Sequence, residues 1–256
     1  WANNFGGSPT TINNAGAITR TVGTGTAGLD MAVLNGAGSI DVQTGILRLS
    51  SGASGTGTLS GAITVASGAT LDFSGATYNV NAGASYSGAG ATSVSGSTVN
   101  FAIVPAFGNL TVSSGTLNLN AGMTGSGTLS ISGGAANFNA ASTVAGALSF
   151  SGGTLGGTDT LTLNGSGNTW TSGTMSGTGS TVVSGANTLA LSGAGTKTFT
   201  QRTLTTNGLV TWSAGQINAG GGGVFNNNGT FDIQTNTNWA NNFGGSPTTI
   251  NNAGAI

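Results

Sequence analysis

Apolar side chains alternate with small polar ones along most of this chain. Representative pairs are Ile40/Val42, Ile63/Val65, Leu117/Leu119, Leu161/Leu163, Leu189/Leu191 and Phe231/Ile233. A period of two places one side chain inside a β-strand layer and the next one outside it. No stretch has helical periodicity, and Gly at this density disfavours helices. The pattern therefore predicts an all-β chain built from short strands.

A short repeat links three consecutive segments, which begin at Gly108, Gly127 and Gly146 and align without a gap, so the period is 127 − 108 = 19. Three sets of matching residues fall in register: Leu110, Leu129 and Leu148; Val112, Ile131 and Phe150; Gly115, Gly134 and Gly153. Periods of roughly 20 residues are typical of solenoids, in which the short strands of successive coils stack.

The same core element returns elsewhere with looser spacing, as an apolar residue, two small residues, a Gly and a further apolar residue. Examples run from Val42 to Leu47, Val65 to Leu71, Trp170 to Met175 and Trp212 to Ile217. Both Trp side chains occupy positions that the pattern directs inward. We therefore predict that they belong to the core and are not platforms for sugar binding.

These repeats predict a parallel β-solenoid (β-helix) of about 11–12 coils, each of roughly 19–23 residues, for one long repeat. At a strand spacing of ~4.8 Å the long repeat rises on the order of 55 Å. The alternative is an antiparallel β-sandwich or barrel, which needs turns that reverse the chain direction. In-register recurrence of the same residue types favours stacking of like on like.

The two ends of the chain share one sequence. The segment 1–18 reads WANNFGGSPTTINNAGAI, and the segment 239–256 repeats it without a mismatch, so the offset between the copies is 239 − 1 = 238. One interpretation is an engineered duplication or an overlap. We favour a second one, in which 1–238 is one long tandem repeat and 239–256 starts the next identical copy. Trp1 and Ile256 are then expected to be internal points of a longer array.

Composition narrows the class of protein. The chain has 49 Gly, 41 Thr, 29 Ser and 27 Asn, more than half of its 256 residues, whereas charged residues are only 4%. Disordered chains combine low hydrophobicity with high net charge, but here hydrophobic residues are 37% and the net charge is −1. No apolar run approaches the ~18 residues of a membrane helix, so we expect no membrane span in this segment.

The few ionisable residues leave little candidate chemistry. They are Arg20, Arg48, Lys197 and Arg202, with Asp30, Asp41, Asp72, Asp159 and Asp232, and the chain has no Glu, His or Cys. The usual serine, cysteine and zinc-dependent hydrolases, zinc sites and disulfides are excluded. Four scattered cations give no phosphate-binding surface, so we expect no nucleic-acid partner.

The spacing of the Asp residues brings no three carboxylates to one face of ~20-residue coils. Their nearest approach to a catalytic group is Asp30 and Asp41 with Arg20 or Arg48. Asp41 with Arg48 is more simply a surface ion pair worth under ~1 kcal/mol. We predict that the chain is not an enzyme, with no catalytic, cofactor-binding or metal-binding residue.

Asn and Thr are placed where stacking would align them. Asn clusters at predicted strand ends, in Asn13–Asn14, Asn207 and Asn226–Asn228, which predicts amide ladders between coils in preference to ligand binding. Thr-x-Thr occurs at Thr24/Thr26, Thr158/Thr160/Thr162 and Thr196/Thr198/Thr200. Ice-binding solenoids carry flat Thr arrays, but the three segments with the 19-residue period contain no paired Thr column.

The strings NNNGTFDI and INNAGAI, with the Trp-x-x-Gly elements at Trp170 and Trp212, resemble repeats of very large bacterial surface proteins. The resemblance is to extracellular β-helices of the filamentous-haemagglutinin and autotransporter-adhesin type. It implies secretion, an extracellular or cell-surface location, and a fibrous or adhesive role. No binding residue of that family can be transferred to this chain.

Neither end of the sequence reads as a solenoid cap, which natural solenoids use to cover their open ends. We therefore expect the next copy, tandem or on another subunit, to cover each end. The expected function is a non-catalytic structural segment of an extracellular fibre or cell-surface stalk, assembled by coaxial stacking. The low charge permits lateral bundling. The alternatives are an adhesin module that binds a surface or glycan and, third, an ice-binding solenoid.

Overall fold

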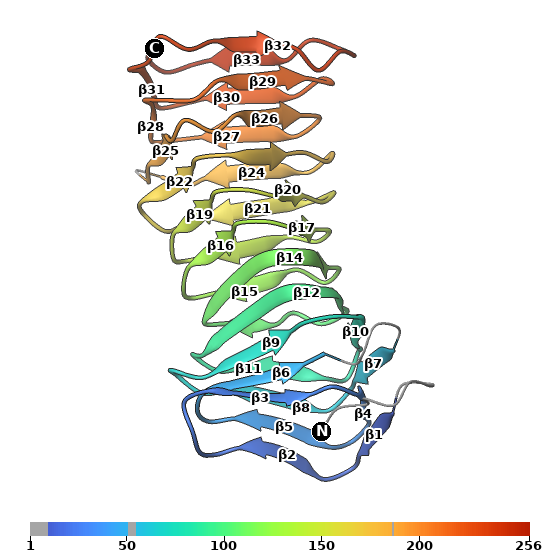
Figure 1. The fold of residues 1–256 in the computed structure, drawn as a ribbon. Coiled ribbons are helices and arrows are strands. Elements are labelled where there is room, and N and C mark those ends of the chain that lie inside the picture. Colours follow the sequence, from blue (N-terminus) through green and yellow to red (C-terminus); the bar gives the residue numbers. More distant parts are fainter. Residues whose placement is uncertain (1–9, 51–54, 186) are drawn as a thin grey trace.

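The computed structural model describes residues 10–50, 55–185 and 187–256. Every regular element in these ranges is a β-strand, and every strand pairing between them is parallel. The strands wind into a solenoid of about 11 coils (Figure 1). The predicted parallel β-solenoid is thus confirmed, and the antiparallel alternative is wrong.

Each coil has three strand positions, which stack into three faces along the axis. Face 1 contains β3 (Thr26–Leu29), β6 (Ile46–Leu49), β9 (Thr70–Phe73), the first parts of β12 (Ala91–Phe101) and β14 (Asn109–Leu119), β16 (Leu129–Ile131), β19 (Leu148–Phe150), β22 (Asn168–Trp170), β25 (Leu189–Leu191), β28 (Leu209–Trp212) and β31 (Thr230–Ile233).

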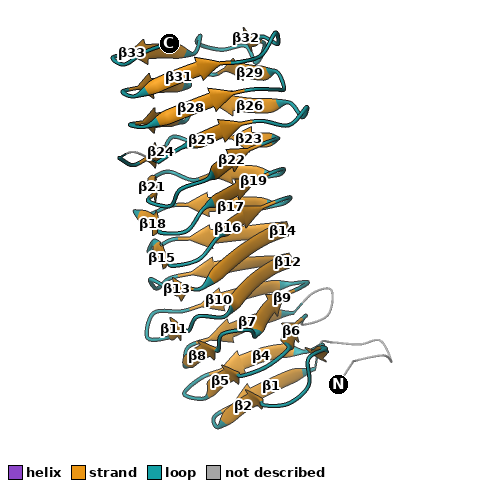
Figure 2. Ribbon diagram, turned by 90° about the vertical axis from the view of Figure 1, so that its left-hand side faces the viewer, coloured by secondary structure: helices purple, strands orange, loops and turns teal. Residues whose placement is uncertain are grey.

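Face 2 follows face 1 along the chain. It contains β1 (Thr11–Asn14), β4 (Ala32–Asn35), β7 (Thr56–Leu59), β10 (Thr77–Val80), the later parts of β12 and β14, β17 (Ala135–Phe138), β20 (Thr154–Gly156), β23 (Gly173–Met175), β26 (Lys197–Thr200), β29 (Ile217–Gly220) and β32 (Trp239–Asn241). The strands β12 and β14 bend through the corner between faces 1 and 2 without a break (Figure 2).

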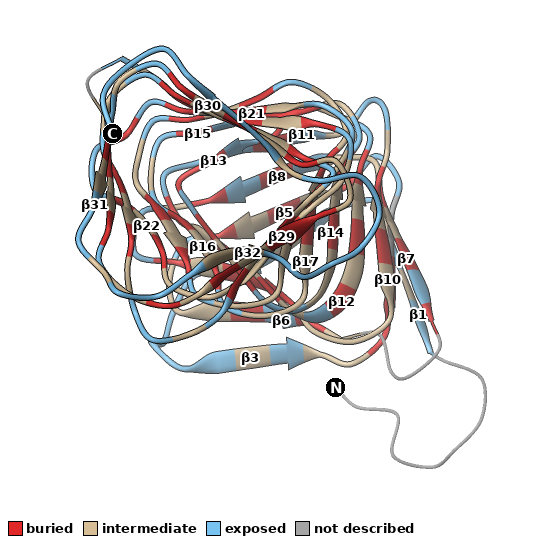
Figure 3. Cartoon of the chain, turned by 90° about the horizontal axis from the view of Figure 1, so that it is seen from above, coloured by how far each residue is buried: buried red, intermediate tan, exposed pale blue. Residues whose placement is uncertain are grey.

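Face 3 completes each coil. It contains β2 (Ala17–Arg20), β5 (Ser39–Val42), β8 (Ala62–Val65), β11 (Ser85–Ser87), β13 (Ala106–Phe107), β15 (Met123–Gly125), β18 (Ser142–Val144), β21 (Thr160–Leu163), β24 (Ser180–Val183), β27 (Thr203–Thr206), β30 (Val224–Asn227) and β33 (Thr249–Asn252). Seen down the axis, buried residues recur on every face around a shared interior (Figure 3).

The 19-residue repeat sets the register of the core. Leu129 pairs with Leu110 on the coil before it and with Leu148 on the coil after it. The next inward column, from Val112 through Ile131 to Phe150, is fully buried. Because a one-residue slip would turn each of these side chains outward, the alternation fixes the stacking. The register predicted from the repeat is confirmed.

The matching glycines form the corner between faces 1 and 2. Gly115, Gly134 and Gly153 have φ angles of 78°, 60° and 72°, in the left-handed region that side chains other than Gly rarely adopt. The coils also approach closely here, since a Cβ on Gly134 would lie 2.5 Å from the carbonyl oxygen of Gly115. Conformation and close contact both require Gly at this corner.

The looser copies of the element do not all turn the same corner. Those at Trp170 and Trp212 join face 1 to face 2, whereas those at Val42 and Val65 join face 3 to face 1. One local turn thus serves two corners. Both Trp side chains are buried, as predicted, and Trp170 stacks on Phe150 with ring centroids 5.8 Å apart.

Coil lengths vary more widely than predicted. Ala91 pairs with Asn109, a separation of 109 − 91 = 18, whereas Val224 pairs with Thr249, a separation of 249 − 224 = 25. The strands stay in register while the corners between them lengthen or shorten. The predicted coil length of roughly 19–23 residues is therefore too narrow a range, because irregular corners leave no periodic signal in the sequence.

Candidate functional site: the two end coils and the polar outer faces

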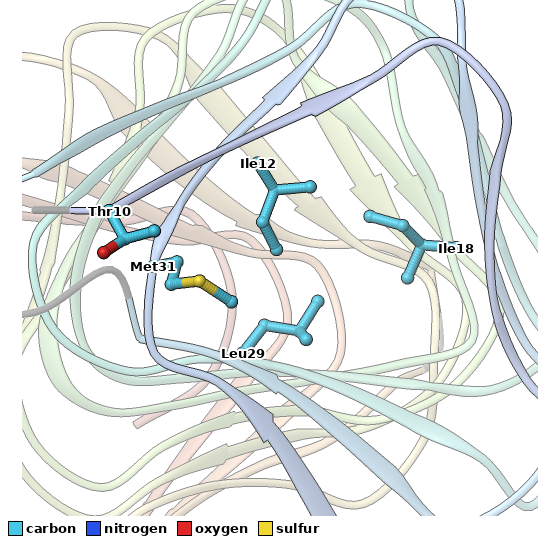
Figure 4. A pocket seen from close by; sticks show the side chains of 5 residues that line it. All are labelled: Thr10, Ile12, Ile18, Leu29 and Met31. Atoms are coloured by element: carbon cyan, nitrogen blue, oxygen red, sulfur yellow. The ribbon is translucent and has the colours of Figure 1, made fainter. Parts of the chain in front are cut away.

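The apolar interior opens at the N-terminal end of the described solenoid. Side chains from β1, β2, β3 and the adjoining corners line a cavity of about 350 Å³ (Figure 4). The lining residues are Thr10, Ile12, Ile18, Leu29 and Met31. Ile12, Ile18 and Leu29 also pack against the main core, so this cavity is the end of the continuous interior. It is a surface on which another apolar layer can pack.

Apolar side chains are also exposed on the C-terminal coil. Ile233, Ile250 and Ile256 are 48%, 45% and 67% exposed. Ile250 pairs with the fully buried Phe225 of the preceding coil, so it continues an inward column. Among the described residues, no strand pairs with the outer edge of β33. The two end coils therefore present apolar patches bordered by strand edges.

An asparagine ladder runs along the outer side of face 2. Asn100 donates to Asn79 Oδ1 at 2.8 Å, Asn118 donates to Asn100 Oδ1 at 2.7 Å, and Asn137 donates to Asn118 Oδ1 at 2.8 Å. Each amide thus donates to one coil and accepts from the next. These residues lie outside the Asn clusters from which amide ladders were predicted, although their spacing of 18–21 residues carries the signal.

The predicted Asn clusters contact other coils as well. Asn228 donates to Asn207 Oδ1 at 2.9 Å, and Asn251 donates to Asn226 Oδ1 at 2.8 Å. The prediction of inter-coil amide pairs is confirmed at these positions. Asn14 differs, because its amide donates to the backbone oxygen of Ser39 at 2.9 Å.

Threonines line the outer side of face 2 beside the Asn ladder. A register column contains Thr56, Thr77, Thr98 and Thr116, then Ala135, then Thr154, Thr174 and Thr198. This Thr column was not predicted. On face 3 the 19-residue segments align Thr124, Thr143 and Thr162 singly, and the residues two positions earlier are Gly122, Ala141 and Thr160. The expectation that these segments carry no paired Thr column is confirmed.

Three of the four cations bind backbone carbonyls at corners. Lys197 Nζ donates to the carbonyl oxygens of Gly193, Gly195 and Ala214 at 3.0–3.2 Å, and burial lowers the pKa of this amine. Arg202 Nη2 donates to the Ser180 oxygen at 2.7 Å, and burial lowers the pKa of its guanidinium to about 10.

Arg20 makes the same kind of contact, with Nη2 donating to the carbonyl oxygens of Gly23 and Gly25 at 3.4 and 2.9 Å. These cations supply additional donors to carbonyls at sharp turns, and the Gly25 oxygen also accepts from the N–H of Ile46 at 3.1 Å. Their role is structural, and nothing in the sequence pattern indicated it.

The predicted ion pair between Asp41 and Arg48 is wrong. Arg48 Nε lies 2.7 Å from the carboxylate of Asp72, which is its register partner on the next coil of face 1. Asp41 lies on face 3 and accepts a hydrogen bond from Gln43 Nε2 at 2.6 Å. Stacking between coils brings Asp72 to Arg48, while the corner at Gly45 separates Asp41 from it.

Elsewhere the acids are scattered, and Asp30 accepts a hydrogen bond from Ser50 at 3.0 Å. Over residues 10–50, 55–185 and 187–256, no three His, Cys, Asp or Glu side chains gather as a metal site. That the chain is not an enzyme stays a prediction.

No protein-family model matches this chain, and neither the curated proteins nor the solved structures contain a match. The resemblance to bacterial surface proteins therefore rests on the sequence motifs, while the β-helical repeat architecture is established by the fold. In the described residues no helix has the length and apolar character needed to cross a membrane.

Proposed function

We propose that this chain is a non-catalytic structural segment of an extracellular fibre or cell-surface stalk, assembled by coaxial stacking of identical repeats. One observation carries the proposal: each end coil joins apolar side chains from the continuous interior to strand edges. At the C-terminal coil these side chains are Ile233, Ile250 and Ile256. A further coil would cover them and extend the parallel ladder on the faces beneath it.

Burial of apolar surface favours this assembly. Fully burying an Ile side chain contributes about 1.5–3 kcal/mol, so three half-exposed ones contribute a few kcal/mol before backbone pairing is added. The net charge of −1 opposes stacking only weakly. A heterologous end-to-end contact that does not close on itself generates an open filament.

The proposed extracellular location and the relation to bacterial filamentous-haemagglutinin or autotransporter-adhesin repeats rest on the resemblance in sequence. The composition of the chain suits an extracellular location in two respects. Reactive Cys side chains are absent from the sequence, and only four residues are Lys or Arg, the sites of tryptic cleavage. We further propose that lateral contacts between neutral outer faces bundle the filaments.

Electron microscopy and sedimentation of the purified chain test this function. We expect thin continuous fibres that lengthen with protein concentration. Ile250→Asp places a charge in the stacking surface and should abolish fibres, whereas Thr143→Asp, which faces outward from β18 in the middle of the solenoid, should leave them intact. Compact monomers of the unmodified chain at every concentration would refute the proposal.

The threonine column on face 2 supports ice binding as a second candidate. Thr77, Thr98 and Thr116 lie on three successive coils about 4.8 Å apart, beside the ladder of Asn side chains, so the face is regular in two directions. Thermal hysteresis of the purified chain measures this activity, and Thr98→Tyr should remove it. No hysteresis in the unmodified chain would exclude ice binding.

The adhesin alternative receives no comparable support. In the described part of the chain, Phe243 is the aromatic side chain that is largely exposed, at 56%. The two Trp residues of the core elements are buried at 1% and 3% exposure and cannot add to this single ring as a platform for a glycan.

A further inference from the structure

The two copies of the repeated sequence occupy different faces of the solenoid. Thr11–Asn14 forms β1 on face 2, whereas the identical Thr249–Asn252 forms β33 on face 3. The next element shifts in the same sense: Ala17 lies in β2 on face 3, but its equivalent Ala255 bridges Thr230 on face 1. Relative to the three faces, the second copy is therefore advanced by one third of a turn.

The two copies use complementary backbone atoms. At the C-terminal coil, the N–H groups of Thr249 and Gly254 donate to the carbonyl oxygens of Gly223 and Asn227 in the coil before them, at 2.9 and 3.1 Å. At the N-terminal coil the carbonyl oxygen of Gly16, the equivalent of Gly254, accepts from the N–H of Ser39 in the coil after it, at 2.8 Å. At this glycine the N–H bonds to the coil before it and the carbonyl oxygen bonds to the coil after it. One glycine can therefore bond to both neighbouring coils at once.

The side chain of the last Asn in TINN follows the same division. Asn252 Oδ1 accepts from Asn227 Nδ2 in the coil before it at 2.6 Å. Its equivalent Asn14 uses the other end of the amide, Nδ2, to donate to the Ser39 oxygen in the coil after it at 2.9 Å. At the C-terminal coil that Nδ2 instead contacts the Gly254 oxygen at 3.1 Å. One amide can thus connect a coil below with a coil above.

We propose that a second copy of this chain docks on the C-terminal coil, rotated by a third of a turn, with residues 248–256 of the first copy in the place of residues 10–18 of the second. This inference rests on the proposed coaxial assembly. The shared strand would pair with β30 of its own chain and with β4 of the next. Residues 10–18 of the second copy are displaced from that position.

The shared segment also joins the two apolar surfaces. Ile250 takes the place of Ile12, its equivalent, in the lining of the N-terminal cavity and rests on Phe225 of its own chain. Ile256 likewise takes the place of Ile18. The exposed Ile side chains of the C-terminal coil thereby line the N-terminal cavity of the next copy, in the positions that its own Ile residues occupy, and the strand register does not change.

A simple stack of whole chains is the competing arrangement, and it gives different neighbours. Without the rotation β33 would lie under β2 on face 3, with Asn251 opposite Thr19. In the rotated junction Ala255 stands where Ala17 stands and so lies opposite Ser39. The two arrangements therefore predict different contacts between chains.

Pairs of Cys substitutions distinguish these contacts, because the chain contains no native Cys. In the full chain, Ala255→Cys with Ser39→Cys reports the rotated junction, and Asn251→Cys with Thr19→Cys reports the unrotated stack. Adjacent strands bring paired Cα atoms within the roughly 4.4–6.8 Å that a disulfide allows. In both pairs the two positions lie in coils near opposite ends of the solenoid, so only chains in contact can be linked.

We expect mild oxidation to give a ladder of disulfide-linked multimers for the first pair, at least tenfold stronger than for the second, with the 39–255 link identified by mass spectrometry. Each single-Cys variant gives dimers at most. Fibres linked through 251 and 19, or fibres linked through neither pair, would overturn the rotated junction while leaving coaxial assembly standing. Absence of fibres in the unmodified chain would overturn both.

The axial repeat of unmodified fibres gives a second measurement that needs no substitution. Face 3 counts eleven steps from β2 to β33, so an unrotated stack repeats every twelve coils. The shared segment shortens the repeat to eleven and a third coils, a difference of about 3 Å at ~4.8 Å per coil. Helical reconstruction resolves this difference, and the longer repeat would contradict the proposal.

Discussion

The corner glycine Gly134 should be among the least replaceable residues of the solenoid. Gly134→Ala introduces a Cβ at a φ of 60°, where an L side chain costs about 1–2 kcal/mol. The same Cβ lies 2.5 Å from the carbonyl oxygen and 3.0 Å from the nitrogen of Gly115, both backbone atoms of the preceding coil. Separating the coils to relieve this contact strains the ladder, at a further cost of about 1–3 kcal/mol.

Two matched substitutions separate these costs. Gly68 has a φ of 80° but nothing within 4 Å of its Cβ position, so Gly68→Ala should cost only the conformational part, about 1–2 kcal/mol. Gly28 lies in β3 with open space around its Cβ position and no positive φ, and Gly28→Ala should change stability by less than ~0.5 kcal/mol. Gly134→Ala should reach about 2–5 kcal/mol, the sum of the conformational and contact costs.

Hydrogen exchange read by mass spectrometry is the appropriate assay, because coils contact only their neighbours and a solenoid need not unfold as one unit. The opening free energy of peptides covering the substituted coil is compared with the unmodified chain for each variant. If Gly134→Ala and Gly68→Ala cost the same within about 0.5 kcal/mol, the usual scatter of independent substitutions, then close contact between coils contributes nothing to the need for Gly134, contrary to the expectation.

Three further outcomes are expected. Asn100→Ala breaks two amide bonds of the face 2 ladder and should lower the local opening free energy by about 1–2 kcal/mol, whereas Asn139→Ala, at an exposed pair, should cost under ~0.5 kcal/mol; equal losses would contradict a cooperative ladder. Burial raises the pKa of Tyr86 above 10, so the unfolded chain loses this proton first and the free energy of unfolding falls as the pH rises above 10. Denaturation curves of Tyr86→Phe should show a smaller fall over this pH range. An equal fall in the variant would show that Tyr86 is not the group responsible. Asp72→Asn should lower the free energy of unfolding by about 1 kcal/mol and Asp41→Asn should leave it almost unchanged, both measured by denaturation. The opposite order would support the pair between Asp41 and Arg48 that was expected from the sequence.

The architecture and the core follow from the local pattern of residues along the chain. Alternation of apolar and small residues specifies strands, and the 19-residue recurrence at Leu110, Leu129 and Leu148 specifies parallel stacking, since only like-on-like coils bring these residues into one column. The inward direction of Trp170 and Trp212 follows from the same alternation. These features are local or strictly periodic, so each is visible without knowledge of the whole coil.

Which residues face each other across irregular coils depends on how the coils stack in three dimensions. Arg48 meets Asp72 at a separation of 24 residues, and Arg202 reaches Ser180 across 22. The separation between partners on adjacent coils ranges from 18 to 25, so small differences accumulate and the angular position of a distant residue cannot be obtained by counting. For this reason one sequence, TINN, lies on face 2 at one end and on face 3 at the other. Pairing of the intervening strands fixes that phase, because each ladder transmits its register only to the next coil.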